Sequence, residues 1–235
     1  MNTGGTIPAV APHTLGPRRG PLHERLSAYE AEWRIVNNYH AVARIATVAD
    51  AGPLRLCDVT HRARFGCKGR GAADWLQTQG IALPPAPNRW RATAGGALIA
   101  RLGPEDFLLC DDFDGDAGLP AQLDHGWHAD AAAGGYPVPR QFAVAALIID
   151  GAAAPALFAR LCAVDLRPQH FAPDAVAQTF VANCTATVLR RDRGGEPGYL
   201  VFVDTTLAVY LWDLLLATAA NLHGRAVGFA QLAAD

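Results

Sequence analysis

Residues 64–80 read RFGCKGRGAADWLQTQG, and residues 146–162 read ALIIDGAAAPALFARLC. Both segments begin with a short apolar run, turn at a glycine, and continue through small residues into an amphipathic stretch. Both are followed, after a variable interval, by an acidic turn and an apolar strand, at 103–110 and at 194–203. This shared order predicts that the chain contains one α+β unit twice.

The spacing of the two copies shows how closely they correspond. Position 69 corresponds to 151, an offset of 82, and position 107 corresponds to 199, an offset of 92. The difference between the offsets indicates an insertion of about ten residues in the second copy. Two copies are fewer than a repeat array needs, so they predict two paired halves of one domain.

Hydrophobic periodicity and turn residues predict the individual elements. The expected strands are 55–59, 64–68, 97–102, 107–110, 142–149, 177–181, 185–190 and 199–203. The expected helices cover about 72–80 and 155–162, and a third begins at the N-cap residue Thr205. The apolar face expected for this third helix consists of Leu207, Tyr210, Leu211, Leu214 and Leu215. The hairpin turns indicate antiparallel neighbours, which favours the α+β class over a doubly wound sheet.

The N-terminal region differs from the rest in composition. Residues 1–20 are rich in Gly, Pro and Thr, which predicts a flexible arm. Residues 22–34 place Leu22, Leu26, Tyr29 and Trp33 on one helical face, which predicts a helix. We therefore expect an arm at 1–20, a helical appendage at 21–50, and a domain at 51–235 with halves of about 51–135 and 136–235.

Composition excludes several classes of function. The chain has 235 residues and a formal net charge of -2, so it has no electrostatic footprint for nucleic acid. No apolar run is long enough to span a membrane, and the first residues do not form a signal peptide. An odd number of cysteines without metal-finger spacing favours reduced, buried thiols in a cytoplasmic protein: Cys57, Cys67, Cys110, Cys162 and Cys184.

Two short motifs have spacings that a ligand site could use. His125 and His128, followed by Asp130, have a spacing that a metal site could use, but a third ligand is missing, so we expect a surface loop and no metal. Gly69-Arg70-Gly71 follows a strand as a dinucleotide turn would, but Asp74 stands where the third glycine is needed. We therefore expect no nucleotide site there.

No residue is predicted to be catalytic. Ser27 is the only serine and lies in the N-terminal region, so a Ser–His–Asp hydrolase is excluded. Asp58, His61 and Cys67 could form an acid–base or Cys–His pair, but nothing activates the thiol, and we expect it to be buried. Glu196 lies between two expected strands in the segment GGEPG, and this position alone predicts a carboxylate in a turn.

Longer motifs resemble a known superfamily. CDVTHRARFGCKGRGAADWLQ and GGEPGYLVFVDTTLAVYLWDLLL resemble the opening strand–turn–helix and the closing hairpin of the folate-binding domain of aminomethyltransferases, the T-protein of glycine cleavage. Within that superfamily the chain is most similar to the gamma subunit of heterotetrameric sarcosine oxidase. That similarity rests on five ordered motifs over about 54–216: FGCKG, PNR, LGPEDFLL, AQT and YLWD.

The resemblance implies a fold and a role. The fold is two pseudo-symmetric α+β halves with antiparallel sheets, without the C-terminal barrel of the aminomethyltransferases. The implied role is that of an accessory, non-catalytic subunit of a heterotetrameric oxidoreductase of one-carbon metabolism. Its partners would be larger flavoprotein and folate-binding subunits, which would carry FAD, FMN and NAD. The complex would demethylate an N-methyl amine and pass the one-carbon unit to tetrahydrofolate, and this chain alone would bind no cofactor.

The departures from the aminomethyltransferase pattern separate two hypotheses. That family has paired aspartates after Gly-Gly, whereas here Gly96 is followed by Ala97-Leu98-Ile99, which cannot supply an acid. The barrel would follow Gly228, yet the sequence ends at Asp235. Glu196 alone matches a folate contact, as the carboxylate that would bond the pterin. The alternative to the accessory subunit is therefore a free-standing folate-binding or one-carbon-transfer protein that uses Glu196.

Overall fold

The computed structural model describes residues 16–46, 52–111, 118–128 and 134–232. Its strands are β1 Arg18–Arg19, β2 Ala31–Val36, β3 Tyr39–Ile45, β4 Arg55–Asp58, β5 Arg64–Gly69, β6 Arg89–Ala92, β7 Leu98–Gly103, β8 Asp106–Cys110, β9 Gly135–Val138, β10 Val144–Asp150, β11 Val176–Val181, β12 Cys184–Arg190, β13 Gly198–Asp204 and β14 Arg225–Ala226. Its helices are α1 His23–Leu26, α2 Ala72–Thr78, α3 Leu119–Gly126, α4 Arg140–Ala143, α5 Ala154–Leu161, the 3-10 turn η2 Thr205–Leu207, α6 Ala208–Ala220 and α7 Phe229–Leu232.

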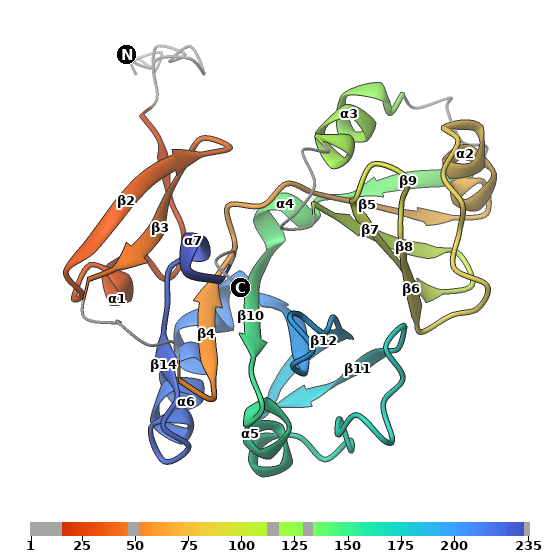
Figure 1. Ribbon diagram of the computed structural model, residues 1–235. Helices are drawn as coiled ribbons and strands as arrows, with labels where there is room; N and C mark the ends of the chain where they lie inside the picture. The colour runs from red at the N-terminus through yellow and green to blue at the C-terminus, as the bar shows by residue number, and fades with distance from the viewer. Residues whose placement is uncertain (1–15, 47–51, 112–117, 129–133, 233–235) are drawn as a thin grey trace, which may run out of the picture.

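Two mixed layers of sheet and helix form the body of the molecule (Figure 1). One sheet has the order β6-β7-β8-β5-β9, and the other has the order β11-β12-β13-β10-β4-β14. Their facing sides share one apolar cluster, to which Leu98, Leu108, Ile148 and Phe202 belong. The outer side of the first sheet packs on α2 and α3, and that of the second packs on α5 and α6. Successive side chains on each strand therefore point alternately into the cluster between the sheets and into the cluster under the helices.

The duplication predicted from the sequence is present in the strand order. The runs β6-β7-β8-β5 and β11-β12-β13-β10 have the same order and the same antiparallel pairing. Cys67 pairs with Phe107 in the first sheet, and Ile149 pairs with Tyr199 in the second. These pairs are related by the same two offsets, 82 and 92, so the sequence correspondence is also a correspondence of register. The α+β fold of two similar halves with antiparallel sheets is confirmed.

The extra residues of the second half do not form a single insertion. Through the strand pairings, positions 67, 89, 101 and 107 correspond to 149, 175, 190 and 199. The offset therefore grows in three steps, across the α2–β6 connection, the β6–β7 hairpin and the β7–β8 turn. Longer hairpins and turns accommodate such additions at the surface without disturbing the core.

Each half contributes one strand to the sheet of the other half. β4 precedes β5 in the chain but pairs with β10, and β9 precedes β10 but pairs with β5. Gly69 and Gly151 end the two receiving strands with positive φ values of 103° and 110°. A Cβ atom at Gly69 would overlap the carbonyl oxygen of Gly134, and one at Gly151 would overlap that of Pro53. Only glycine can lie this close to a carbonyl oxygen. Both turn glycines are therefore needed for the strand exchange, in which each half contributes one strand to the sheet of the other.

Corresponding residues also meet where the two halves face each other. Arg89 of β6 and Ala175, next to β11, form an antiparallel bridge, although they occupy equivalent places in the two copies. The backbone N–H of Trp90 donates to the carbonyl of Asp174, and that of Val176 donates to the carbonyl of Asn88. Self-pairing of equivalent segments is expected at a pseudo-twofold axis, where each contact has a counterpart.

The expected helix over 22–34 was wrong. Only His23–Leu26 is helical, and the chain then forms the hairpin β2–β3. Asn37 and Asn38 supply the two positive φ values, 49° and 61°, that a two-residue hairpin turn of this hand requires. Leu22 and Leu26 still reach the core, but from a short helix beside a three-stranded sheet of order β1-β3-β2. Residues 1–15 of the expected arm lie outside the described residues, and the proposed domain division stays a prediction.

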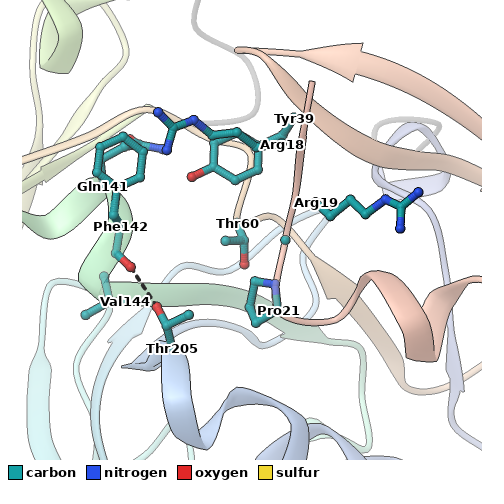
Figure 2. Close-up of a pocket in the computed structure, with 10 residues that line it drawn as sticks. Arg18, Arg19, Pro21, Tyr39, Thr60, Gln141, Phe142, Val144 and Thr205 are labelled. Carbon is teal, nitrogen blue, oxygen red and sulfur yellow. Dashed lines mark hydrogen bonds between the residues drawn. The ribbon is translucent and has the colours of Figure 1, made fainter. Parts of the chain in front are cut away.

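The N-terminal sheet lies against the body and leaves a cavity beside α4. The cavity has a volume of about 440 Å³ and is lined by residues of β1, β3, α4 and β10, together with Thr60 and Thr205 (Figure 2). Gln231 of α7 closes the other end of β3, because its side chain accepts from the N–H of Ile45 and donates to the carbonyl of Ile45. The sheet is therefore held by hydrogen bonds to the C-terminal segment.

The start and face of the last long helix differ from expectation. Asp204, not Thr205, is the cap, and its carboxylate accepts from the N–H of Thr206. The buried face is Ala208, Leu211, Trp212, Leu215 and Ala219. Leu207 and Tyr210 are instead 38% and 50% exposed. At 13 residues α6 is short, and within the described part of the chain no helix has the length and hydropathy that a membrane crossing requires.

Alanine at either exchange glycine tests this account. Gly69→Ala and Gly151→Ala should each lower the free energy of unfolding by about 2 kcal/mol or more, because positive φ and backbone overlap both oppose a Cβ atom. Urea denaturation of the purified full chain measures the change. Gly95→Ala is the control, since a Cβ atom there meets open space. Equal stabilities of all three variants would contradict the strand-exchange constraint.

Candidate functional site

Glu196 lies at the tip of the β12–β13 hairpin. Arg193 and Glu196 exchange backbone hydrogen bonds of 3.0 and 2.8 Å. Gly194 and Gly195 between them have positive φ values of 53° and 78°. This is the two-residue turn that Gly-Gly favours, and it fixes the direction in which Glu196 leaves the backbone. The Glu196 side chain is half-buried, with no ion pair to a described residue.

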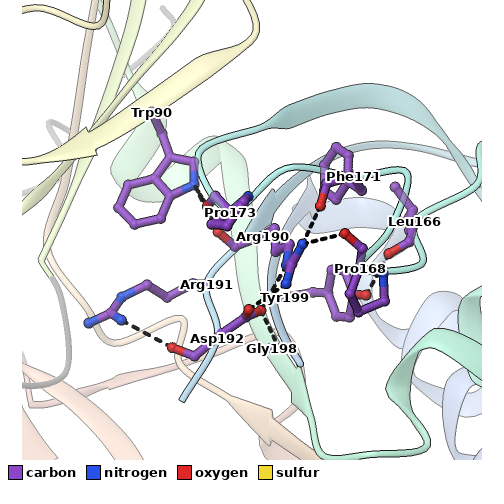
Figure 3. Close-up of polar contacts among 10 residues, drawn as sticks. All are labelled: Trp90, Leu166, Pro168, Phe171, Pro173, Arg190, Arg191, Asp192, Gly198 and Tyr199. Atoms are coloured by element: carbon purple, nitrogen blue, oxygen red, sulfur yellow. Dashed lines mark hydrogen bonds and ion pairs between the residues drawn. The ribbon is translucent and has the colours of Figure 1, made fainter. Parts of the chain in front are cut away.

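A buried arginine holds the base of this hairpin. The guanidinium of Arg190 donates to the carbonyl oxygens of Pro168 and Phe171, and to both carboxylate oxygens of Asp192 (Figure 3). Asp192 in turn accepts from the N–H of Gly198. The hydrogen bond to Asp192 raises the pKa of Arg190, so the guanidinium keeps its charge. The turn that carries Glu196 is therefore rigid.

Two aromatic side chains extend this support to the other half. The indole N–H of Trp90 donates to the carbonyls of Arg190, at 2.8 Å, and Pro173, at 3.0 Å. The hydroxyl of Tyr199 donates to the carbonyl of Leu166 at 2.6 Å. Burial raises the pKa of Tyr199 to about 12, so it remains a neutral donor. The hairpin is thus fixed from both halves of the molecule (Figure 3).

Apolar side chains fill the layer between the two sheets beside this hairpin. The cavity left there measures about 10 Å³, room for a single water at most. Arg191 and Arg193 are among its lining residues, and Glu196 is not. The guanidinium of Arg193 donates to the carbonyl of Leu232 at 3.0 Å, and the Leu232 side chain packs into the layer. Ala97, Leu98 and Ile99, at the place of the missing acid, are all buried.

A buried carboxylate, which the sequence reading missed, ties the hairpin to the strand exchange. Asp150, at the end of β10, is fully buried and bonds Arg55 of β4 at 2.8 Å. Arg193 approaches the same carboxylate at 3.9 Å. The only signal in the sequence was a charged residue directly before the Gly151 turn, at the end of an apolar strand. This cluster joins β4, β10 and the Glu196 hairpin.

Of the candidate acid–base and thiol residues, His61 and Cys67 are buried and Asp58 is half-buried. His61 is 4% exposed, lies against Phe229 with a ring distance of 4.9 Å, and has its pKa lowered by burial to about 3. Asp58 accepts from the N–H of Thr60, and burial raises its pKa. Burial likewise raises the pKa of the Cys67 thiol to about 12. A neutral histidine and a protonated thiol are structural groups here, as the sequence reading expected for Cys67.

The two short motifs also have structural roles. His125 ends α3, with its Nδ1 2.7 Å from the carbonyl of Ala121, and Trp127 packs edge-on against Trp75 at 4.4 Å. Asp130 lies outside the described residues, and within them no group of three potential metal ligands occurs. Gly69 is accounted for by its approach to Gly134 and not by a phosphate.

Comparison with known proteins bears on the fold. No protein-family model and no curated sequence matches the chain. A chain of the heterotetrameric sarcosine oxidase from Corynebacterium sp. U-96, solved in complex with pyrrole 2-carboxylate, matches with a TM-score of 0.67 and 20% identity, over 88% of this chain and 97% of that one. The glycine cleavage system aminomethyltransferase T from Bartonella henselae matches with a TM-score of 0.65 and 14% identity, over 91% of this chain and 60% of that one.

The chain has the same fold as these two proteins. It spans nearly all of the sarcosine oxidase chain but only about three fifths of the aminomethyltransferase. At these identities the likeness establishes the fold and not the activity. The contact of Glu196 with folate stays a prediction.

The buried state of His61 has a consequence for stability against pH. The unfolded chain protonates His61 near pH 6.5, whereas the folded protein resists protonation down to about pH 3. Stability is therefore lost as the pH falls through this window, by up to about 1.4 kcal/mol per pH unit. His61→Leu should reduce this slope in urea denaturation at about pH 7.5 and about pH 5.5. An unchanged slope in His61→Leu would contradict the assignment.

Proposed function

We propose that this chain is an accessory, non-catalytic subunit of the gamma type in a cytoplasmic flavoenzyme complex like sarcosine oxidase. The complex would oxidatively demethylate an N-methyl amine and pass the one-carbon unit to tetrahydrofolate. Larger partner subunits would hold FAD, FMN, NAD and the folate. This chain would stabilise the assembly.

The observation that carries the proposal is the mutual coverage with the sarcosine oxidase chain. That chain, from a protein described as heterotetrameric, is matched over 97% of its length. The aminomethyltransferase T chain is matched over only 60%. The nearly complete match to a chain of a heterotetrameric enzyme supports the role of a subunit.

The chemistry of the inter-sheet layer supports the same proposal. A pterin needs a pocket of several hundred Å³, whereas the cavity between the sheets measures about 10 Å³. The segment where an acid would be required consists of the buried residues 97–99. The side chain of Leu232 lies in the same layer. Residues 97–99 therefore supply no acid to this layer, and the carboxylate that lines the cavity is that of Asp111.

Exposed apolar residues offer a surface for a partner. Phe142 of α4 is 55% exposed, and its carbonyl accepts from the hydroxyl of Thr205, which brings α4 to the start of the last helix. Leu207 and Tyr210 lie one turn apart at that start and are also exposed. Exposed apolar clusters commonly mark interfaces between proteins.

The alternative is a free-standing folate-binding or one-carbon-transfer protein that uses Glu196. One observation favours it. Glu196 is presented by a turn that Arg190, Asp192 and Tyr199 make rigid, as a ligand contact would require. In this case the chain alone would bind tetrahydrofolate.

Assembly is tested by co-expression of the chain with the products of the genes that neighbour its own. We expect the chain to co-elute with them in one complex that contains flavin. The double change Leu207→Asp and Tyr210→Asp should weaken co-elution, because two charges would have to be desolvated at the interface. Ile35→Asp, at an exposed apolar residue of β2, is the control. A stable monomer that associates with no flavoprotein would contradict the proposal.

Titration calorimetry with tetrahydrofolate distinguishes the alternative. The accessory role predicts no heat of binding for the chain alone at about 1 mM ligand. A free-standing folate protein predicts binding that Glu196→Ala weakens by at least about tenfold, because a hydrogen bond to a charged group is lost. Glu105→Ala is the matched control, because Glu105 occupies the corresponding hairpin turn of the first half. Binding sensitive to Glu196 alone would replace the first proposal by the second.

A further inference from the structure

The cavity beside the N-terminal sheet has unused hydrogen-bond donors. Tyr39 is only 7% exposed, lines the cavity, and its hydroxyl has no hydrogen-bond partner among the described residues. The hydroxyl oxygen is not among the fully buried polar atoms that lack a partner, so it is reached from the space of the cavity. A free hydroxyl at the wall of a cavity is therefore a position at which a ligand atom can bond.

Arg18 presents a second donor beside this hydroxyl. Its backbone N–H donates to the carbonyl of Asn38 at 2.7 Å, and β1 pairs with β3, so its position is fixed. Its guanidinium lies over the ring of Phe142, 4.3 Å from the centroid, and makes no hydrogen bond or ion pair to another described residue. The ring orients the guanidinium by a cation–π contact and leaves its N–H edge available.

Gln141 supplies a third donor with a defined orientation. Its side-chain oxygen accepts from the backbone N–H of Arg64 at 2.7 Å, so the amide nitrogen must be at the other side. That nitrogen has no partner among the described residues. Arg18, Tyr39, Gln141 and Phe142 lie together on one side of the cavity (Figure 2). Arg19 points away from this group.

A buried positive charge lies behind these donors. Arg64 is 3% exposed, and its guanidinium donates only to the backbone carbonyls of Arg140, Thr60, Arg62, Gln141 and Val144. No carboxylate of a described residue lies within ion-pair distance of it. Burial lowers the pKa of Arg64, and Asp58 is a carboxyl group that acts on it by charge and whose own pKa burial raises. The charge of Arg64 is thus solvated by dipoles but not neutralised, which favours an anion nearby.

The walls of the cavity limit the kind of anion. No Asp or Glu lines the 440 Å³ space, and Pro21, Val144 and Phe142 make part of its wall apolar. Asp124 lines the adjoining cavity of about 370 Å³, which shares Arg18 and Tyr39 with this one. A volume of this size suits a small organic molecule that has one charged end and a compact apolar body. A planar carboxylate can accept two parallel hydrogen bonds from a guanidinium and a further one from a phenol.

We propose that this cavity binds a small organic carboxylate, whose oxygens accept from the Arg18 guanidinium, the Tyr39 hydroxyl and the Gln141 amide. Its apolar body lies against Phe142, Val144 and Pro21. The site is separate from the Glu196 hairpin. It does not depend on the accessory role, because the chain alone contains every residue of the site.

Calorimetric titration of the purified full chain with benzoate tests the site. We expect binding of benzoate, and no binding of benzamide, which has the same shape without the charge. Tyr39→Phe removes only the hydroxyl and should weaken binding about tenfold. Arg18→Gln should weaken it at least as much. Arg34→Gln, at an exposed arginine of β2, is the control and should bind as the wild type does.

Four results would overturn the proposal. One is the absence of heat with benzoate at about 10 mM. The second is equal binding of benzamide, since the charge would then be irrelevant. The third is unchanged affinity in both Tyr39→Phe and Arg18→Gln, with thermal unfolding as a check that the variants are folded. Inorganic phosphate is the last probe: tighter binding of phosphate than of benzoate would reject a carboxylate with an apolar body.

Discussion

The contact of a glycine with a carbonyl oxygen, made once in each half, is the constraint on which this molecule depends. Gly69 approaches Gly134, and Gly151 approaches Pro53, so closely that no Cβ atom fits. Through these contacts β9 completes the sheet of the first half and β4 that of the second. Neither half can complete its sheet alone, and the two copies therefore fold as one unit.

The strand exchange also determines what the layer between the sheets can hold. With both sheets fixed and Arg89 bridged to Ala175, the facing sides lie close enough for their side chains to fill the space. Arg193 then binds the carbonyl of Leu232, whose side chain packs into the same layer. The fold of the aminomethyltransferases is thus present with a closed interior. The cavity with unused donors lies elsewhere, where the N-terminal sheet meets α4.

Most elements of the two halves could be predicted from the sequence, because their signals are local. Apolar runs that end at Gly69 and Gly151 specify strand, turn and helix within about fifteen residues of chain. The N-terminal hairpin could not be predicted in this way, since Leu22, Leu26, Tyr29 and Trp33 have helical spacing by coincidence. Asn37-Asn38 was the competing turn signal. In α6, nearly every residue is apolar, so periodicity alone could not identify the buried face.

The sequence by itself determined the α+β class, the duplication and its register, because these follow from short-range patterns repeated at two offsets. It also determined that Ala97-Leu98-Ile99 supplies no acid. Only the tertiary structure decided that Asp150 pairs with Arg55, that Glu196 does not line the inter-sheet cavity, and that Arg18 and Tyr39 face a cavity together. Those groups are far apart in the chain, and their roles depend on burial and on missing partners, which a sequence does not record.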